Sequence, residues 1–141
     1  MTTDFIVREF KDKDYAEVSE LWLETDLTNP VRNDSLSSIN TTLNHGGVFF
    51  VLEQTNTKKI IGTSWITNDG RRLYLHHFGI KPKYQGKKLS HMLLKASLNF
   101  AEEKNMQIKL EVHDKNNIAL NLYKKAGFKY LGDYKVYIIR R

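Results

Sequence analysis

A lysine-rich turn between an expected strand and an expected helix carries the clearest chemical signal in this chain. Residues 80–94 read Ile-Lys-Pro-Lys-Tyr-Gln-Gly-Lys-Lys-Leu-Ser-His-Met-Leu-Leu. Backbone N–H groups at the start of a helix have no partner within it and lie at the positive end of its dipole. Such a turn can bind phosphate or pyrophosphate, and the four lysines add positive charge. The segment therefore predicts a polyphosphate-bearing ligand. A lysine-rich surface turn that caps an ordinary amphipathic helix is the alternative that this stretch leaves open.

A second segment, residues 116–128, has the pattern of a capped helix with one chemically capable side chain. Asn116 can cap its start and Gly127 its end. Leu122 is expected in the core, whereas the hydroxyl of Tyr123 needs a polar partner if the ring is buried. For a tyrosine considered alone, packing of the helix on a sheet is the simpler interpretation.

The elements that must position these residues alternate between strand and helix. Asn68-Asp69-Gly70 is the strongest turn signal in the sequence. The order βααβββαβαββ predicts an α/β (α+β) domain, with helices covering a mixed, largely antiparallel sheet, and a single domain over residues 1–141. We expect strands at residues 5–10, 48–53, 60–67, 73–80, 108–112, 128–131 and 135–139, helices at 12–23, 35–43, 89–104 and 117–126, and a polar connection over 24–34.

Composition excludes several classes of protein. The 141 residues are 40% hydrophobic and 27% charged, as in ordinary globular domains. No apolar run is long enough to cross a bilayer, and the N-terminus has no charged region before an apolar core, so we expect neither a membrane partner nor a signal peptide. The chain has no cysteine, which excludes disulfides, thiolate catalysis and cysteine-ligated zinc and suits a cytoplasmic protein.

The net charge of +6 suits an anionic cofactor, an anionic membrane or nucleic acid. The positive charge is spread along the chain, and aromatic residues do not alternate with arginines as they do in common RNA-binding sheets. We therefore do not expect nucleic acid as a partner, and a basic domain that binds it is the least favoured interpretation.

Together, residues 80–90 and 116–128 resemble the GNAT superfamily of acetyl-coenzyme A-dependent N-acetyltransferases. That family has a V-x-P-like step, then Q/R-x-x-G-x-G/A at the pyrophosphate site, and later N-x-x-A-x-x-L-Y-x-x-x-G-F. The chain departs from the first motif, because Lys88 and Ser90 stand where glycine and then glycine or alanine are expected. A Cβ at residue 88 narrows the approach to the pyrophosphate, so we expect weakened but surviving cofactor binding. The matching residues are Ile80, Pro82, Gln85, Asn116, Ala119, Leu122, Tyr123, Gly127 and Phe128.

The resemblance implies a GNAT-like fold over essentially the whole chain, with acetyl-CoA as co-substrate and no metal. It implies direct transfer of the acetyl group to a primary amine within a ternary complex. Backbone N–H groups around Phe78 and Ile80, at an expected bulge in the strand, would hold the acetyl carbonyl and the pantetheine arm. The cofactor-binding residues that it implies are Phe78, Gly79, Ile80, Gln85, Gly86, Lys87, Lys88, Leu89, Ser90, Asn116 and Tyr123.

The resemblance also implies catalytic roles. Tyr123 matches the family's tyrosine near the coenzyme sulfur and is expected to be the general acid. Glu111 is similar to the glutamate base of the ribosomal-protein N-terminal acetyltransferases, and His76 to a histidine that assists proton removal in serotonin N-acetyltransferases. We favour Glu111 narrowly, with His76 as the second candidate and bulk water as a third. Strand alternation predicts that His77 points to the face opposite His76.

The acceptor remains open between a small-molecule amine, a peptide N-terminus and a protein lysine. Family members line the acceptor cleft with the first two helices and their connection, here about residues 22–35. Glu24, Asp26 and Asp34 in that segment slightly favour a cationic amine. Because Lys88 and Ser90 alter the turn, a non-catalytic acyl-coenzyme A-binding sensor of the same fold is the alternative function. A monomer and a homodimer are both compatible with the sequence.

Overall fold

The computed structural model describes residues 4–27 and 34–141. Residues 28–33 of the expected polar connection lie outside the described residues. The chain divides into two compact units, Met1–Leu110 and Glu111–Arg141, which are described in turn. The single domain expected over residues 1–141 stays a prediction.

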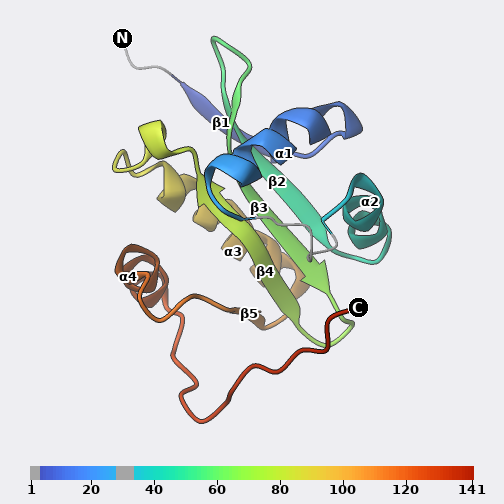
Figure 1. Ribbon diagram of the computed structural model, residues 1–141, viewed down its shortest axis with the longest axis vertical. Helices are drawn as coiled ribbons and strands as arrows, with labels where there is room; N and C mark the ends of the chain where they lie inside the picture. The colour runs from blue at the N-terminus through green and yellow to red at the C-terminus, as the bar shows by residue number, and fades with distance from the viewer. Residues whose placement is uncertain (1–3, 28–33) are drawn as a thin grey trace. The chain divides into compact units, whose positions relative to one another are not determined.

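The first unit is built on a mixed five-stranded sheet (Figure 1). Neighbouring strands from β1 to β4 are antiparallel, and β5 joins the edge of β4 in parallel. The expected mixed, largely antiparallel sheet is thus confirmed for this unit. The strands are β1 (Phe5–Glu9), β2 (Val48–Gln54), β3 (Ile60–Asn68), β4 (Leu73–Ile80) and β5 (Ile108–Leu110).

Helices cover both faces of the sheet. Successive side chains of a strand point to opposite faces, and the central strands carry apolar side chains on both. Phe49 and Val51 of β2 pack with α1 (Tyr15–Glu24) and α2 (Leu36–Asn44). Leu52 of the same strand packs on the other face with Leu89 and Leu93 of α3 (Leu89–Lys104). The sheet therefore has one face for the N-terminal helices and one for α3.

Local capping explains where the helices of the first unit begin. The Oγ of Ser35 accepts a hydrogen bond from the backbone N–H of Ser38, as expected for an N-cap residue. The helix expected from residue 12 instead starts with a 3-10 helix (Asp12–Asp14), and the α-helix itself begins at Tyr15. The physical reason is that Asp14 accepts the backbone N–H of Lys11, which tightens the chain one turn before the helix.

The tight turn predicted at Asn68-Asp69-Gly70 joins β3 to β4. The side chain of Asn68 accepts the N–H of Gly70, whose φ is 84°, and the carboxylate of Asp69 accepts the N–H groups of Arg71 and Arg72. These short-range bonds are the reason that asparagine, aspartate and glycine favour turns.

The second unit contains helix α4 (Asn117–Ala126) with both of its expected caps. The side chain of Asn116 accepts the N–H of Ala119, and Gly127 takes a left-handed conformation with φ of 106°. The N–H of Phe128 then donates to the carbonyl of Tyr123, which closes the helix end.

The prediction of strands at residues 128–131 and 135–139 is wrong. Residues 128–141 form no strand, and the strand expected over 108–112 ends at Leu110. Tyr130, Tyr137 and Ile139 have strand-favouring side chains but are largely exposed. Propensity alone does not hold a strand, because it needs a hydrogen-bonded neighbour and a buried face. Within residues 111–141 the structure contains no strand that could pair with them.

A buried charge cluster ties β1 and β2 to the start of the N-terminal helices. The guanidinium of Arg8 forms two hydrogen bonds to Asp14, at 2.9 and 3.0 Å, and one to Glu53 at 2.9 Å. The carboxylate side chains are only 5% and 9% exposed. Two buried carboxylates sharing one cation make the cation difficult to remove.

We expect Arg8→Met to lower the free energy of unfolding by about 2–4 kcal/mol at neutral pH, because both carboxylates would stay buried without their cation. Burial alone would raise the pKa of Asp14, but hydrogen bonds from Arg8 and from the Lys11 N–H outweigh it and hold that pKa below 3.8. A lowered carboxylate pKa stabilises the folded state above the unfolded pKa, and this contribution is lost as the pH falls through the folded value. The deficit of the variant should therefore shrink below about pH 4.

Urea unfolding at pH 7 and pH 3 measures both effects. Lys59→Met, which removes an exposed cation, is the matched control and should stay close to the parent protein. Equal stability of Arg8→Met and the parent at pH 7 would contradict the role of the cluster.

Candidate active site

A β-bulge interrupts β4 close to the position that the family resemblance implies. Thr63 pairs with Gly79 and Trp65 with His76, so Ser64 on β3 faces both His77 and Phe78 on β4. His77 takes up the extra residue with a φ of 45°, an uncommon conformation for a non-glycine residue.

Side chains from the first helix hold the bulge in place. The hydroxyl of Thr63 donates to the carbonyl of His77 at 2.7 Å and accepts the indole N–H of Trp22 at 2.9 Å. Thr63 is fully buried and Trp22 almost so. The strained backbone is therefore fixed by a buried polar chain that begins in α1.

The bulge changes where the two histidines point. Both rings lie beside Trp65, with ring centroids 6.2 Å away for His76 and 5.2 Å away for His77. The expectation that they point to opposite faces is wrong, because the extra residue in β4 breaks the alternation.

Each histidine has its own polar partner. Nε2 of His76 lies 2.9 Å from the hydroxyl of Thr67, and its ring stacks on Tyr74 with centroids 4.1 Å apart. Nε2 of His77 lies 2.9 Å from the carboxylate of Asp34, and its ring packs against Trp22. The side chains of His77 and Asp34 are only 11% and 8% exposed. Sequence reasoning missed this pair, since its partners are 43 residues apart and the register shift that joins them leaves no local signal.

The parallel ladder between β4 and β5 covers only the first part of β4. It ends at the pair Leu75 and Leu110, and beyond it His76, Gly79 and Ile80 pair with β3. Within this stretch, Phe78 packs on the α3 face. A Cβ on Gly79 would lie 2.7 Å from the end of the Leu27 side chain. The expected positions around the bulge thus lie beyond the end of the ladder between β4 and β5.

After β4, a 3-10 helix (Pro82–Tyr84) leads into the lysine-rich turn. The side chain of Gln85 donates to the carbonyl of Ile80 at 2.9 Å, which braces the turn against the end of the strand. Gly86 and Lys88 both have positive φ, 80° and 62°. The turn therefore reverses the chain before α3 begins at Leu89.

The expected anion-binding donors are present in this turn. Among the described residues, no protein acceptor is found for the backbone N–H groups of residues 86–90. Lys87 and Lys88 are exposed, Ser90 is half-buried, and the side chain of Leu89 is buried in the α3 core. Leu89 can thus contribute through its backbone alone.

The departure from the family pattern at residue 88 has a visible cost. Lys88 precedes the first helical residue and takes a left-handed conformation, which is unfavourable for a residue with a Cβ. Glycine adopts this conformation without penalty, which explains the glycine in the family pattern. Lysine can adopt it as well, at a cost in free energy.

In the second unit, the candidate residues lie on and before α4. Glu111 is exposed, and the side chain of Asn116 is used in capping the helix. Tyr123 is 9% exposed and lies edge-on to Phe128, with centroids 5.6 Å apart. Burial raises the pKa of Tyr123 to about 12.

The expected acceptor segment is only partly described. Glu24 and Asp26 are exposed, and Asp34 is bonded to His77. Among the described residues no three acidic, histidine or cysteine side chains lie close enough to hold a metal ion. None of the helices in the described ranges is long and apolar enough to span a membrane.

Comparisons with known proteins agree with this geometry. The model of the Acetyltransferase (GNAT) family matches residues 6–128. A GNAT-family acetyltransferase from Staphylococcus aureus has a TM-score of 0.78 at 23% identity, covering 97% of this chain and 96% of its own.

Two further solved structures share the fold at lower identity. Glucosamine-6-phosphate N-acetyltransferase from Arabidopsis thaliana has a TM-score of 0.74 at 15% identity, covering 96% of this chain and 98% of its own. AAC(6')-Iy, in complex with a bisubstrate analog of coenzyme A and acetylneamine, has a TM-score of 0.77 at 14% identity, covering 99% and 100%.

The match of the family model over residues 6–128, which include the bulged strand and the turn that follows it, defines this protein as an acetyltransferase of the GNAT type. The chain belongs to the GNAT acetyltransferase family. The expected family and enzyme class are thereby confirmed, and the assigned site residues stay predictions.

We expect Lys88→Gly to raise the free energy of unfolding by up to about 1 kcal/mol, because glycine removes the left-handed penalty. Lys87→Gly is the matched control, since Lys87 does not have a positive φ and glycine there only adds unfolded-state entropy. It should destabilise by about 0.5–1 kcal/mol. Thermal unfolding of both variants measures the difference, and a Lys88→Gly protein less stable than the Lys87→Gly protein would contradict the strain at residue 88.

Proposed function

We propose that the protein moves an acetyl group from acetyl-coenzyme A to a primary amine by direct attack in a ternary complex. The observation that carries the proposal is the run of backbone N–H groups at residues 86–90, which follows a bulged strand and has no acceptor within the described ranges 4–27 and 34–141. Acetyl-coenzyme A carries the pyrophosphate that such a turn binds.

The residues present fit that co-substrate. The N–H groups of residues 86–90 and the ammonium groups of Lys87 and Lys88 offer hydrogen bonds and positive charge to a pyrophosphate. Beyond its parallel ladder with β5, strand β4 leads to the lysine-rich turn, and an extended pantetheine chain would follow this part of the strand in the manner of an added strand. The Lys88 side chain is the feature that fits least well, because its Cβ occupies space that glycine would leave.

The chemistry needs no covalent intermediate on the enzyme. The chain has no cysteine, and direct attack by the amine requires only a proton acceptor, a donor for the developing oxyanion, and an acid for the departing thiolate. We assign the oxyanion donors to the backbone around Phe78 and Ile80, where the bulge turns the peptide groups.

Tyr123 is our general acid, an assignment that rests on its match to the family motif. Its raised pKa, about 12, keeps the phenol protonated throughout the physiological range. A protonated phenol can supply the proton that the coenzyme thiolate requires.

For the proton acceptor we now place His76 before Glu111. A histidine starts near the pKa range that a base needs at neutral pH, whereas a glutamate needs burial to reach it. His76 is half-buried on β4, one residue before the bulge, and Glu111 is exposed. The carboxylate of Asp34 engages His77, which makes that residue better suited to positioning than to proton transfer.

The acceptor is proposed only as a primary amine. The solved structures of the same fold include a glucosamine-6-phosphate N-acetyltransferase and a complex with a coenzyme A–acetylneamine bisubstrate analog, and a peptide or protein amine is equally compatible. We also propose a cytoplasmic location and leave monomer and homodimer open. The strained Lys88 favours one second candidate, a non-catalytic protein of the same fold that senses acyl-coenzyme A.

Release of free thiol from acetyl-coenzyme A in the presence of a broad panel of amines tests the function. We expect turnover with at least one amine and a fall in kcat of about 10²–10⁴-fold in Tyr123→Phe, with little change in the KM for acetyl-coenzyme A. The removal of a hydroxyl that acts only on the leaving group explains this split.

Tyr130→Phe is the matched control, because it removes an exposed phenol hydroxyl that has no part in the proposed site. Coenzyme binding without turnover across the panel would instead favour the sensor. An absence of any coenzyme binding at millimolar concentration would overturn both candidates.

The proton acceptor can be identified from pH–rate profiles of kcat/KM. We expect His76→Ala to lose the rising limb of the profile and about 10²-fold or more in rate, and Glu111→Gln to retain the limb. His77→Ala controls for loss of an imidazole nearby. Loss of the limb only in Glu111→Gln would reverse our order, and its survival in both variants would assign the proton to bulk water.

A further inference from the structure

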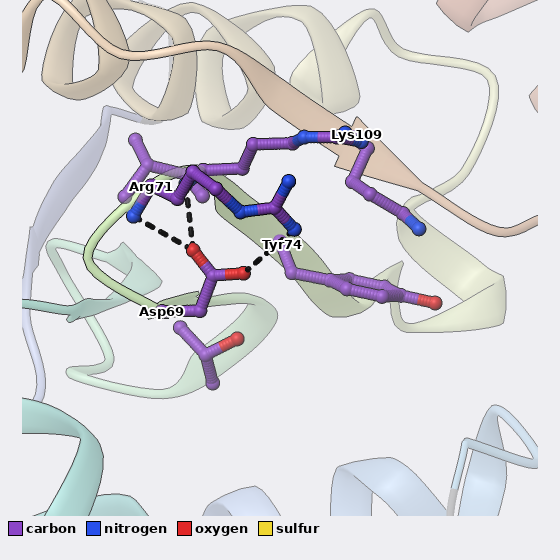
Figure 2. A pocket seen from close by; sticks show the side chains of 7 residues that line it. Asp69, Arg71, Tyr74 and Lys109 are labelled. Carbon is purple, nitrogen blue, oxygen red and sulfur yellow. Dashed lines mark hydrogen bonds and ion pairs between the residues drawn. The ribbon is translucent and has the colours of Figure 1, made fainter.

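A small hollow lies at the other end of β4 from the lysine-rich turn (Figure 2). Its volume is about 140 Å³, several times the roughly 30 Å³ that one water molecule occupies in the liquid. A phosphate or carboxylate group therefore fits inside. The lining residues are Thr67, Asp69, Arg71, Arg72, Leu73, Tyr74 and Lys109.

Positive charge dominates this hollow. Three cationic side chains and one carboxylate line it. The carboxylate of Asp69 is held by the N–H groups of Arg71 and Arg72 and lies 3.7 Å from the guanidinium of Arg71. Among the described residues, neither Arg72 nor Lys109 takes part in an ion pair. The hollow thus keeps two cations beyond the internally paired Asp69 and Arg71.

An aromatic side chain connects the hollow to the proposed proton acceptor. The ammonium of Lys109 lies 5.1 Å from the ring centroid of Tyr74, and Tyr74 stacks on His76. Thr67, another lining residue, contacts Nε2 of His76. Figure 2 shows Lys109 and the ring of Tyr74 on the same side of the hollow.

The hollow and the lysine-rich turn lie at opposite ends of β4. At about 3.3 Å per residue, His76 lies roughly 7 Å from Tyr74 and 13 Å from Arg72. The turn at residues 86–90 follows the opposite end of β4. An anion in the hollow would therefore be a group other than the coenzyme pyrophosphate.

We propose that the hollow lined by Arg72, Lys109 and Tyr74 binds an anionic group of the acceptor, a phosphate or a carboxylate, while the acceptor amine lies near His76. This inference rests on the proposed function. It narrows the acceptor to a small amine with an acidic group several bonds away from the nitrogen.

Matched pairs of acceptors test the proposal. We compare glucosamine 6-phosphate with glucosamine, and 6-aminohexanoate with 6-aminohexanamide, by thiol release from acetyl-coenzyme A. The anionic member of at least one pair should have the higher kcat/KM. The pair that shows the preference distinguishes phosphate from carboxylate.

Charge variants show whether the hollow causes the preference. Arg72→Ala and Lys109→Ala should each reduce the ratio of kcat/KM between the anionic and neutral acceptors by about tenfold, as expected for the loss of a charged hydrogen bond. Arg72→Lys should restore part of the ratio. Lys59→Ala, which removes an exposed cation outside the hollow, is the matched control and should keep the ratio. A ratio near one in the parent protein, or one that Arg72→Ala leaves unchanged, overturns the proposal.

A binding measurement separates this proposal from the proposed function. Titration with inorganic phosphate, followed by amide NMR, should shift the signals of Arg72 and Tyr74 in the parent protein and not in Arg72→Ala. If no amine is acetylated, the proposed function fails, and these shifts alone decide whether the hollow binds anions. Shifts confined to residues 86–90 would overturn the hollow as an anion site.

Discussion

The hydrogen bond from Thr63 to the carbonyl of His77 is the constraint on which the candidate site depends. It joins β3 to an extra residue in β4 and holds that residue at positive φ, in a conformation that costs about 1–3 kcal/mol. Without the extra residue, His77 would lie on the α3 face among apolar side chains, and Asp34 would lose its buried partner. The bulge thus puts two histidines on one face and lets the end of the α1–α2 connection attach to the centre of the sheet. Because Trp22 of α1 bonds to the same threonine, packing of the first helix and geometry of the strand depend on each other.

Much of this fold follows from local sequence signals. Ser35, Asn116 and Gly127 act as caps where their side chains and positions predict, and the continuous apolar run at the start of β2 is typical of a strand buried on both faces. The turn at residues 86–90 is also predictable, because a helix start always leaves donors without partners. Long-range features are not. No local pattern indicates that Asp34 meets His77, or that Met92 of α3 is 38% exposed while Ser97 is fully buried against Ser64. The C-terminal strands were predicted from propensity, but strand formation is decided by partners that propensity does not supply.

The turn before α3 shows how a departure from a family pattern can be tolerated. The backbone at residue 88 takes the left-handed conformation although the side chain disfavours it, because the turn around it is fixed independently. Gln85 bonds back to Ile80, Pro82 limits the conformation of the 3-10 helix, and Leu89 is buried in the α3 core. Glycine at this position would relieve strain, whereas lysine places an ammonium group next to the backbone donors. Lysine at this position therefore costs conformational free energy and adds a positive charge at a site that is expected to bind a pyrophosphate.

Strand β4 has a different chemical character at each end and in its centre, and this order limits what the enzyme can bind. Its C-terminal end leads to backbone donors suited to a pyrophosphate, its centre carries the bulge with the two histidines, and its N-terminal end borders the hollow with Arg72 and Lys109. A rigid strand fixes the spacing between these regions, because the rise per residue varies little. An acceptor that uses both the hollow and His76 must therefore match a set length between its acidic group and its amine. Length selection of this kind needs no contact with the rest of the acceptor, so the fold can discriminate among amines by the distance between their two polar ends.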